Sequence, residues 1–118
     1  MNTTLICIPT KQIADWATFH EVFSDALGFP AFYGRNMYAW VDCMTDADDA
    51  ETRMVQRAVQ PGHLMTLQID DADDFAALCP EQFNALIECT AFVNYRRVEM
   101  GGTPVLSLLL SGHMSAAR

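Results

Sequence analysis

Residues 29–45 read FPAFYGRNMYAWVDCMT, and the expected fold is built around this stretch. Pro30 ends any helix that precedes it, because proline cannot continue a helical hydrogen-bond ladder. Gly34 permits a tight backbone turn, and Asn36 is a residue type that commonly caps the first turn of a helix. The sequence therefore predicts a short helix over residues 37–45.

This helix separates into two faces when successive residues are placed about 100° apart. One face collects Ala39, Trp40, Cys43 and Met44, with Met37 at its edge, and the other carries Tyr38, Val41, Asp42 and Thr45. If the first face packs into the core, the second is exposed. It then presents an aromatic ring, a branched aliphatic side chain and a carboxylate, which is typical of a face that meets another macromolecule.

The same stretch resembles the barstar family of ribonuclease inhibitors, whose signature is close to P-x-Y-Y-G-x-N-x-D-A-L-W-D-C-L-T. The resemblance is carried by Pro30, Phe32, Tyr33, Gly34, Asn36, Ala39, Trp40, Asp42, Cys43 and Thr45. Apolar, strand-like segments near both ends of the chain fall where that family has strands, so the resemblance extends over residues 3–111.

Membership of that family would imply a protein that binds a small basic ribonuclease one to one, blocks its active site and protects the cell that makes it. Asp42 stands at the family's central contact. The departures are Phe32 for an interface tyrosine, Tyr38 for an aspartate, Trp40 for a buried leucine, Val41 for an exposed tryptophan and, on a loose alignment, Asn94 for a glutamate. These changes imply a related or different nuclease toxin as the partner.

From the helix and the resemblance together we expect one partner-binding surface. It comprises Phe32, Arg35, Asn36, Met37, Tyr38, Val41, Asp42, Thr45, Asp46 and Asn94. An acidic side chain on a short rigid helix can enter a cleft that normally holds a phosphate, and pair with the cationic groups lining it. The inhibitor would then act as a mimic of the phosphate.

Composition limits the number of domains and the classes of partner that the chain can have. The chain has 118 residues, about half of them apolar, and fifteen Asp and Glu against seven Lys and Arg, for a formal net charge of −8. We expect one domain over residues 1–111, with a loose tail over residues 112–118. The negative charge argues against binding nucleic acid or an anionic membrane, and favours a basic partner for a protein that is monomeric when free.

Three short runs predict the strands. Residues 3–8 and 104–110 are apolar or β-branched and read as buried strands, the second apolar enough to be covered on both faces. Residues 63–69 alternate in a way that predicts two faces of unequal burial. Because few tight hairpin signals separate these runs, we expect an α/β fold: a small three-stranded parallel sheet flanked by four or five helices.

Helical spacing of apolar residues fills the intervals. It predicts helices over residues 12–27, 70–79 and 82–98, and a short helix within residues 46–62. In the interval 70–79, Asp71 or Asp73 would be the N-cap, with Phe75, Leu78 and Cys79 facing inward. In the interval 82–98, the inward stripe is Phe83, Leu86, Ile87, Thr90, Ala91 and Tyr95; within residues 46–62 it is Met54, Val55, Ala58 and Val59.

The four cysteines show neither C-x-x-C spacing nor clustering with histidine, so we expect buried thiols in a reducing compartment and no metal or cofactor. No basic region followed by a long apolar run begins the sequence, and no apolar segment approaches membrane length, which favours the cytoplasm. The alternative function is a small hydrolase or ligand-binding domain. It would use Cys43 with a distant histidine, or the acidic cluster Asp70, Asp71, Asp73 and Asp74.

Overall fold

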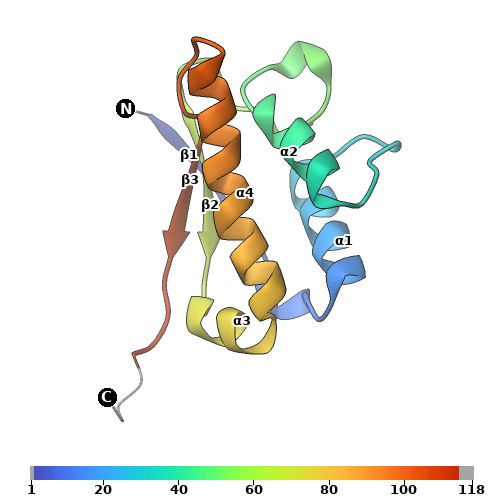
Figure 1. The fold of residues 1–118 in the computed structure, drawn as a ribbon, viewed down its shortest axis with the longest axis vertical. Helices are drawn as coiled ribbons and strands as arrows, with labels where there is room; N and C mark the ends of the chain where they lie inside the picture. The colour runs from blue at the N-terminus through green and yellow to red at the C-terminus, as the bar shows by residue number, and fades with distance from the viewer. Residues whose placement is uncertain (1, 115–118) are drawn as a thin grey trace.

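The computed structural model describes residues 2–114 of the chain. Figure 1 shows a sheet with helices gathered on one side of it. In chain order the elements are β1 (Thr3–Cys7), the 3₁₀ helix η1 (Thr10–Gln12), α1 (Trp16–Leu27), α2 (Met37–Thr45), the 3₁₀ helix η2 (Ala50–Thr52), β2 (Leu64–Ile69), α3 (Ala72–Leu78), α4 (Pro80–Glu99) and β3 (Leu106–Leu110).

The three strands form one parallel sheet in the order β1-β2-β3. In the register, Thr3 lies opposite Leu64 and Met65 opposite Leu106. Each parallel connection needs a crossover, and α1 with α2 forms the first while α3 with α4 forms the second. The predicted three-stranded parallel sheet flanked by four or five helices is therefore confirmed, with four α-helices among the described residues.

Helices cover only one face of the sheet. Its inner face carries Ile6, Met65, Leu67, Ile69 and Leu106, all buried in the core. The outer face leaves Leu5 of β1 and Leu109 of β3 exposed. The expectation that β1 and β3 are buried was wrong, because the described helices leave the outer face of the sheet uncovered and these two strands form its edges.

α1 begins later than predicted, at Trp16 rather than near Gln12. The Oδ1 atom of Asp15 accepts a hydrogen bond from the backbone N–H of Thr18 at 2.8 Å, which completes a capping box and fixes the start of the helix. Residues 10–12 form the separate turn η1 instead. The end of α1 is confirmed at Gly28, whose φ of 71° is the left-handed conformation that glycine favours.

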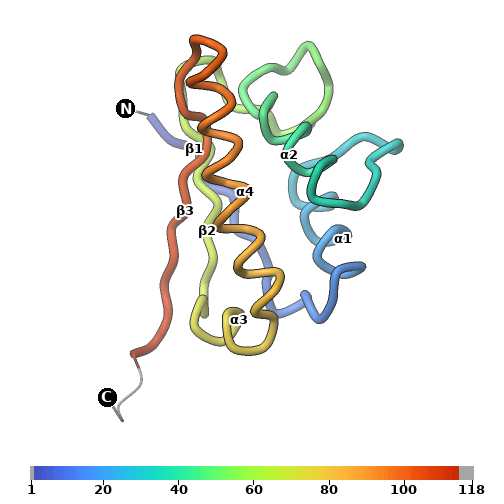
Figure 2. The backbone as a smooth tube through the Cα atoms, in the orientation of Figure 1, coloured from blue at the N-terminus to red at the C-terminus, as the bar shows by residue number. Residues whose placement is uncertain are grey.

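The long connection from α2 to β2 holds no helix over residues 54–59, contrary to the prediction. Figure 2 shows it as an arch beside α2. Val55 and Val59 are each buried, but a loop carries them there: the N–H of Val59 donates to the carbonyl of Ala47 at 2.8 Å, and that of Gln56 to Gly28 at 3.1 Å. The helical spacing of the apolar residues arises without a helix.

α3 and α4 turn somewhat different faces inward than predicted. Leu78 is exposed, while Phe75 and Cys79 are buried as expected. In α4 the residues expected to be inward include Ile87, Ala91 and Tyr95, which are exposed, and the buried line is Gln82, Leu86, Thr90 and Val93. The buried residues of α4 differ from the predicted ones because α4 packs against β3 and also against α2 and α3.

The helices of the described chain include none that is both long and apolar enough to span a bilayer. Residues 111–114 follow β3 without regular secondary structure, and the rest of the predicted tail, residues 115–118, lies outside the described part.

Candidate partner-binding site

A tight turn and a side-chain cap set the start of α2. The Oδ1 atom of Asn36 accepts a hydrogen bond from the backbone N–H of Ala39 at 2.8 Å, as its role of N-cap requires. Arg35, immediately before the cap, has a φ of 53°. The predicted bounds of this helix are confirmed at both ends, because the signals that set them are local.

The inner face of α2 is anchored in the core. Trp40, Cys43 and Met44 are fully buried or nearly so. The ring of Trp40 meets that of Phe23 of α1 edge to face, with centroids 5.7 Å apart. Such packing holds α2 rigidly, so its outward side chains are presented in a fixed arrangement.

The turn before α2 is tied to α1 by a buried polar pair. Nδ1 of His20 lies 2.6 Å from the hydroxyl of Tyr33. Burial and, to a smaller degree, the positive charge of Arg35 lower the pKa of His20 below its ordinary value. Burial likewise raises the pKa of Tyr33. Both rings are therefore neutral near pH 7, and the phenol can donate to the imidazole.

On the outer face of α2, Tyr38 and Asp42 are exposed as predicted, Thr45 is half-buried and Val41 is buried. Tyr38 is 88% exposed, Phe32 in the preceding turn is 70% exposed, and the carboxylate of Asp42 points outward. Val41 is only 6% exposed, so its expected exposure was wrong. It lies at the boundary of the two faces, and α4 covers it there.

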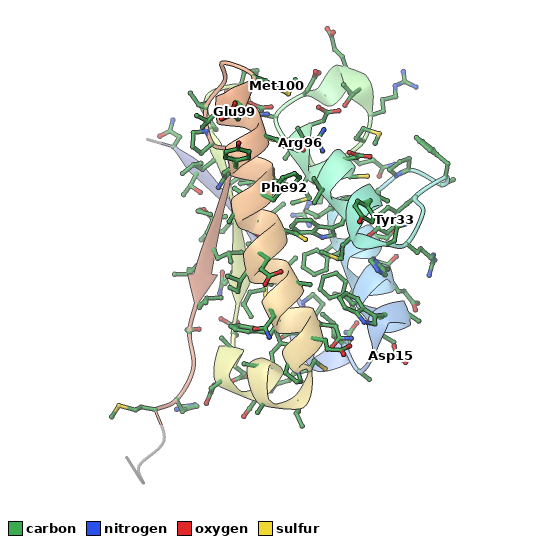
Figure 3. The ribbon with its side chains drawn as sticks, in the orientation of Figure 1. Asp15, Tyr33, Phe92, Arg96, Glu99 and Met100 are labelled. Carbon is green, nitrogen blue, oxygen red and sulfur yellow. The ribbon has the colours of Figure 1, made fainter. Side chains whose placement is uncertain are left out.

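A groove of about 610 Å³ lies between α2 and α4. From α2 it is lined by Met37, Tyr38, Val41 and Asp42, and from α4 by Glu88, Cys89, Phe92 and Arg96. Figure 3 shows Phe92 and Arg96 on the side of α4 that faces α2. The predicted surface on α2 is therefore one wall of the groove, and the other wall, on α4, was not predicted from the sequence.

Asp42 is paired across this groove. The Nη1 atom of Arg96 lies 3.1 Å from Oδ1 of Asp42. The α4 contribution carried a signal in the sequence, since Glu88, Phe92 and Arg96 recur every four residues and so share a helix face. Only the packing of α4 on α2 shows that this face meets Asp42.

Arg97, which follows Arg96 in α4, holds the C-terminal end of α2. Nη1 and Nη2 of Arg97 donate to the two carboxylate oxygens of Asp48 at 2.8 and 2.7 Å, and Nη1 also donates to the carbonyl of Thr45 at 2.8 Å. The hydroxyl of Thr45 donates to Val41 within the helix. Asp46 caps the end of α2, and burial with the nearby charge of Asp49 raises its pKa.

The side chain of Asn94 forms hydrogen bonds within the protein. Its side-chain oxygen accepts hydrogen bonds from the N–H groups of Val105 and Leu106 at 3.0 and 3.1 Å, and its amide nitrogen donates to the carbonyl of Leu106 at 2.9 Å. These bonds fix the entry to β3. The structure thus brings Asn94 to the sheet, apart from the groove that gathers the α2 residues.

The chemistry expected of an enzyme finds little support. Cys43 is buried, and burial together with the charges of Asp42 and Asp46 raises its pKa to about 11, so it stays a thiol at neutral pH. In the acidic cluster, Asp71 pairs with Lys11 at 3.4 Å. Within residues 2–114 no three His, Cys, Asp or Glu side chains are grouped as metal ligands would be.

The sequence matches the family model described as Barstar (barnase inhibitor) over residues 3–101. A search of the curated proteins found no match. The family match covers most of the chain, including both walls of the groove, and the parallel sheet with four helices agrees with it. Members of this family are inhibitors of ribonucleases and not enzymes. The chain belongs to the barstar family of barnase inhibitors.

Proposed function

We propose that this protein inhibits a barnase-like ribonuclease by placing the carboxylate of Asp42 in the nuclease's phosphate-binding site. The observation that carries the proposal is the position of Asp42: its side chain is 62% exposed on a helix whose other face is locked into the core. A fixed anion loses little conformational freedom on binding.

The neighbouring side chains suit a protein partner. Tyr38 and Phe32 place large exposed rings on either side of the helix start, and aromatic residues are enriched at the centres of protein interfaces. Arg35, Asn36 and Met37 lie between these rings in the chain, and Thr45 with Asp46 forms the far end of the same surface. Ring contacts can thus exclude water around the Asp42 ion pair, which strengthens it.

Val41 and Asn94 would contribute less to the proposed contact with the nuclease. Val41 supports the floor of the groove, since it is buried, and Asn94 is engaged with β3. Relative to the family pattern the surface has lost an aspartate at Tyr38 and an exposed tryptophan at Val41. The partner would therefore differ from barnase in the surface around its active site, as a related nuclease toxin against which this protein confers immunity inside the producing cell.

The proposal is tested with the ribonuclease that the immobilised protein captures from a lysate of its native host. Replacing Asp42 with Asn keeps the shape and removes the charge. We expect Asp42→Asn to weaken inhibition of that nuclease by about 2 kcal/mol or more, or about thirtyfold, because the nuclease's cations would be left unpaired. Titration of RNA cleavage against added inhibitor measures this change.

Asp25→Asn is the matched control, since Asp25 is an exposed aspartate of α1 and loses the same charge. It should inhibit as the wild type does, and both variants should unfold at the same denaturant concentration as the wild type. Equal inhibition by Asp42→Asn and the wild type, or capture of no ribonuclease at all, would defeat the proposal.

A further inference from the structure

Two neighbouring arginines of α4 pair with aspartates near α2, and the two pairs differ in kind. The pair of Arg97 with Asp48 is closed: its side chains are only 16% and 12% exposed, and two parallel hydrogen bonds join them. The Nε atom of Arg97 donates to the carbonyl of Thr103 at 2.7 Å. This pair uses its hydrogen-bonding capacity inside the protein.

The pair of Arg96 with Asp42 is open. A single contact of 3.1 Å joins Nη1 to Oδ1, and the side chains are 36% and 62% exposed. A guanidinium carries five N–H donors, and within the described chain this contact is the one hydrogen bond formed by the Arg96 side chain. Several donors of Arg96 and the Oδ2 atom of Asp42 therefore remain for an incoming molecule.

This geometry restricts the charges that a partner of Asp42 can present. A cation that binds Oδ2 of Asp42 is brought next to the guanidinium of Arg96, and like charges repel strongly once water is excluded. A purely cationic cleft would therefore be disfavoured at this surface unless it also offered an anion.

Resting on the proposed function, we infer that the nuclease presents a carboxylate beside the cations that take Asp42, and that this carboxylate binds the free N–H groups of Arg96. Two ion pairs of opposite direction then lie side by side, each satisfying a group that the first would leave unpaired. Charge complementarity of this kind sets specificity by rejecting partners of the wrong pattern. Arg96 is thus a specificity-determining residue.

The groove provides room for such a contact. It opens between Tyr38 of α2 and Phe92 of α4, with Asp42 and Arg96 among its lining residues. The aromatic rings can shield the two ion pairs from solvent, and shielding strengthens charged hydrogen bonds that are fully satisfied. An anion on the partner can reach Arg96 without entering the core, because the guanidinium is partly exposed.

The sign of the effect of Arg96 variants decides the inference. The probe is the ribonuclease captured from the native-host lysate, with its dissociation constant measured by calorimetry. Arg96→Gln should weaken binding by about tenfold or more, because the nuclease's carboxylate loses its partner, and Arg96→Glu should weaken it further through repulsion. Arg53→Glu, the same charge reversal at an exposed loop residue, should change binding by less than about threefold.

Other outcomes overturn the inference. Tighter binding by Arg96→Gln would mean that Arg96 competes with the nuclease for Asp42, and equal effects of Arg96→Glu and Arg53→Glu would mean that only net charge matters. Either result, together with weak binding by Asp42→Asn, would leave the proposed function standing. An unaffected Asp42→Asn would remove the proposed function itself.

A chemical crosslink gives an independent readout. The sequence has one lysine, Lys11, which lies in η1 and pairs with Asp71. Arg96→Lys therefore places a single new amine at the groove, and a carbodiimide would join it to a contacting carboxylate as an amide with loss of water. We expect a crosslinked peptide that joins residue 96 to an Asp or Glu of the nuclease. Its absence from a saturated complex would overturn the inference.

Discussion

His20 shows how a single ionisable side chain helps to hold the turn before the proposed contact surface. Its imidazole is buried and lies 2.6 Å from the hydroxyl of Tyr33, in the turn that leads to α2. Because its pKa is lowered by folding, the unfolded chain binds a proton more readily than the folded one. Stability is therefore complete above the ordinary pKa of 6.5 and falls as the pH drops from there through the lowered pKa.

We predict that His20→Gln flattens this dependence, since glutamine can still bond to Tyr33 but does not titrate. Urea unfolding at several pH values between about 7.5 and 5 measures it. His63→Gln is the control, because His63 lies in the turn before β2 and is less buried than His20. A wild-type unfolding free energy that stays level or rises over this range as the pH falls would contradict the prediction.

At this scale the sequence could indicate that Asp42 faces outward, because its helical phase opposes that of the buried Trp40 and Cys43. It could not settle Val41, which adjoins Trp40 at the boundary between faces. Whether such a boundary residue is exposed depends on the helix that packs beside it, here α4. The pairing of Asp42 with Arg96 escaped prediction for the same reason, since 54 residues separate the two in the chain.

Among the elements, α2 depends strongly on its N-cap because it is short. With nine residues it is too short to be stable in isolation, so the bond from Ala39 to Asn36 and the packing of Trp40 must hold it. Its bounds were predictable because proline, glycine and the cap act locally. The loop over residues 54–59 was not, because buried valines at helical spacing also fit a loop whose backbone bonds to distant carbonyls.

Asn36→Ala should reduce the unfolding free energy by about 1 kcal/mol, because the first turn of α2 loses its side-chain acceptor. It should also weaken binding of the captured ribonuclease by more than the loss of folded protein explains, since the residues that would fray at the start of α2 belong to the proposed contact surface. Denaturant unfolding and calorimetry measure the two effects separately.

The matched control is Asp15→Ala, which removes the cap of α1. It should lower the unfolding free energy as Asn36→Ala does, yet leave the binding constant of the folded protein unchanged. If both cap variants lose binding equally, the start of α2 has no special part in recognition.

The whole molecule carries its charge unevenly. Its formal net charge is −8, and the described ion pairs occupy Lys11, Arg96 and Arg97. The end of α2 and the loop after it are rich in acidic residues, and these lie beside the proposed contact surface. Such a field attracts a basic protein before contact and raises the association rate, whereas in the proposed complex the short-range pairs at Asp42 and Arg96 would determine how long the complex lasts.

Association of the captured ribonuclease should therefore slow by about tenfold between 0.05 and 1 M salt, as the screening length shortens from more than 10 Å to about 3 Å. Stopped-flow mixing measures the rate. Asp49→Asn should slow association at low salt more than Asp74→Asn does, although each removes one exposed charge. Asp74 belongs to α3, which precedes α4 in the chain. The first residue of α4, Pro80, lies about 24 Å along that helix from Arg96, which exceeds the screening length. Equal rates for the two variants, or a rate that ignores salt, would show that the net charge does not steer the encounter.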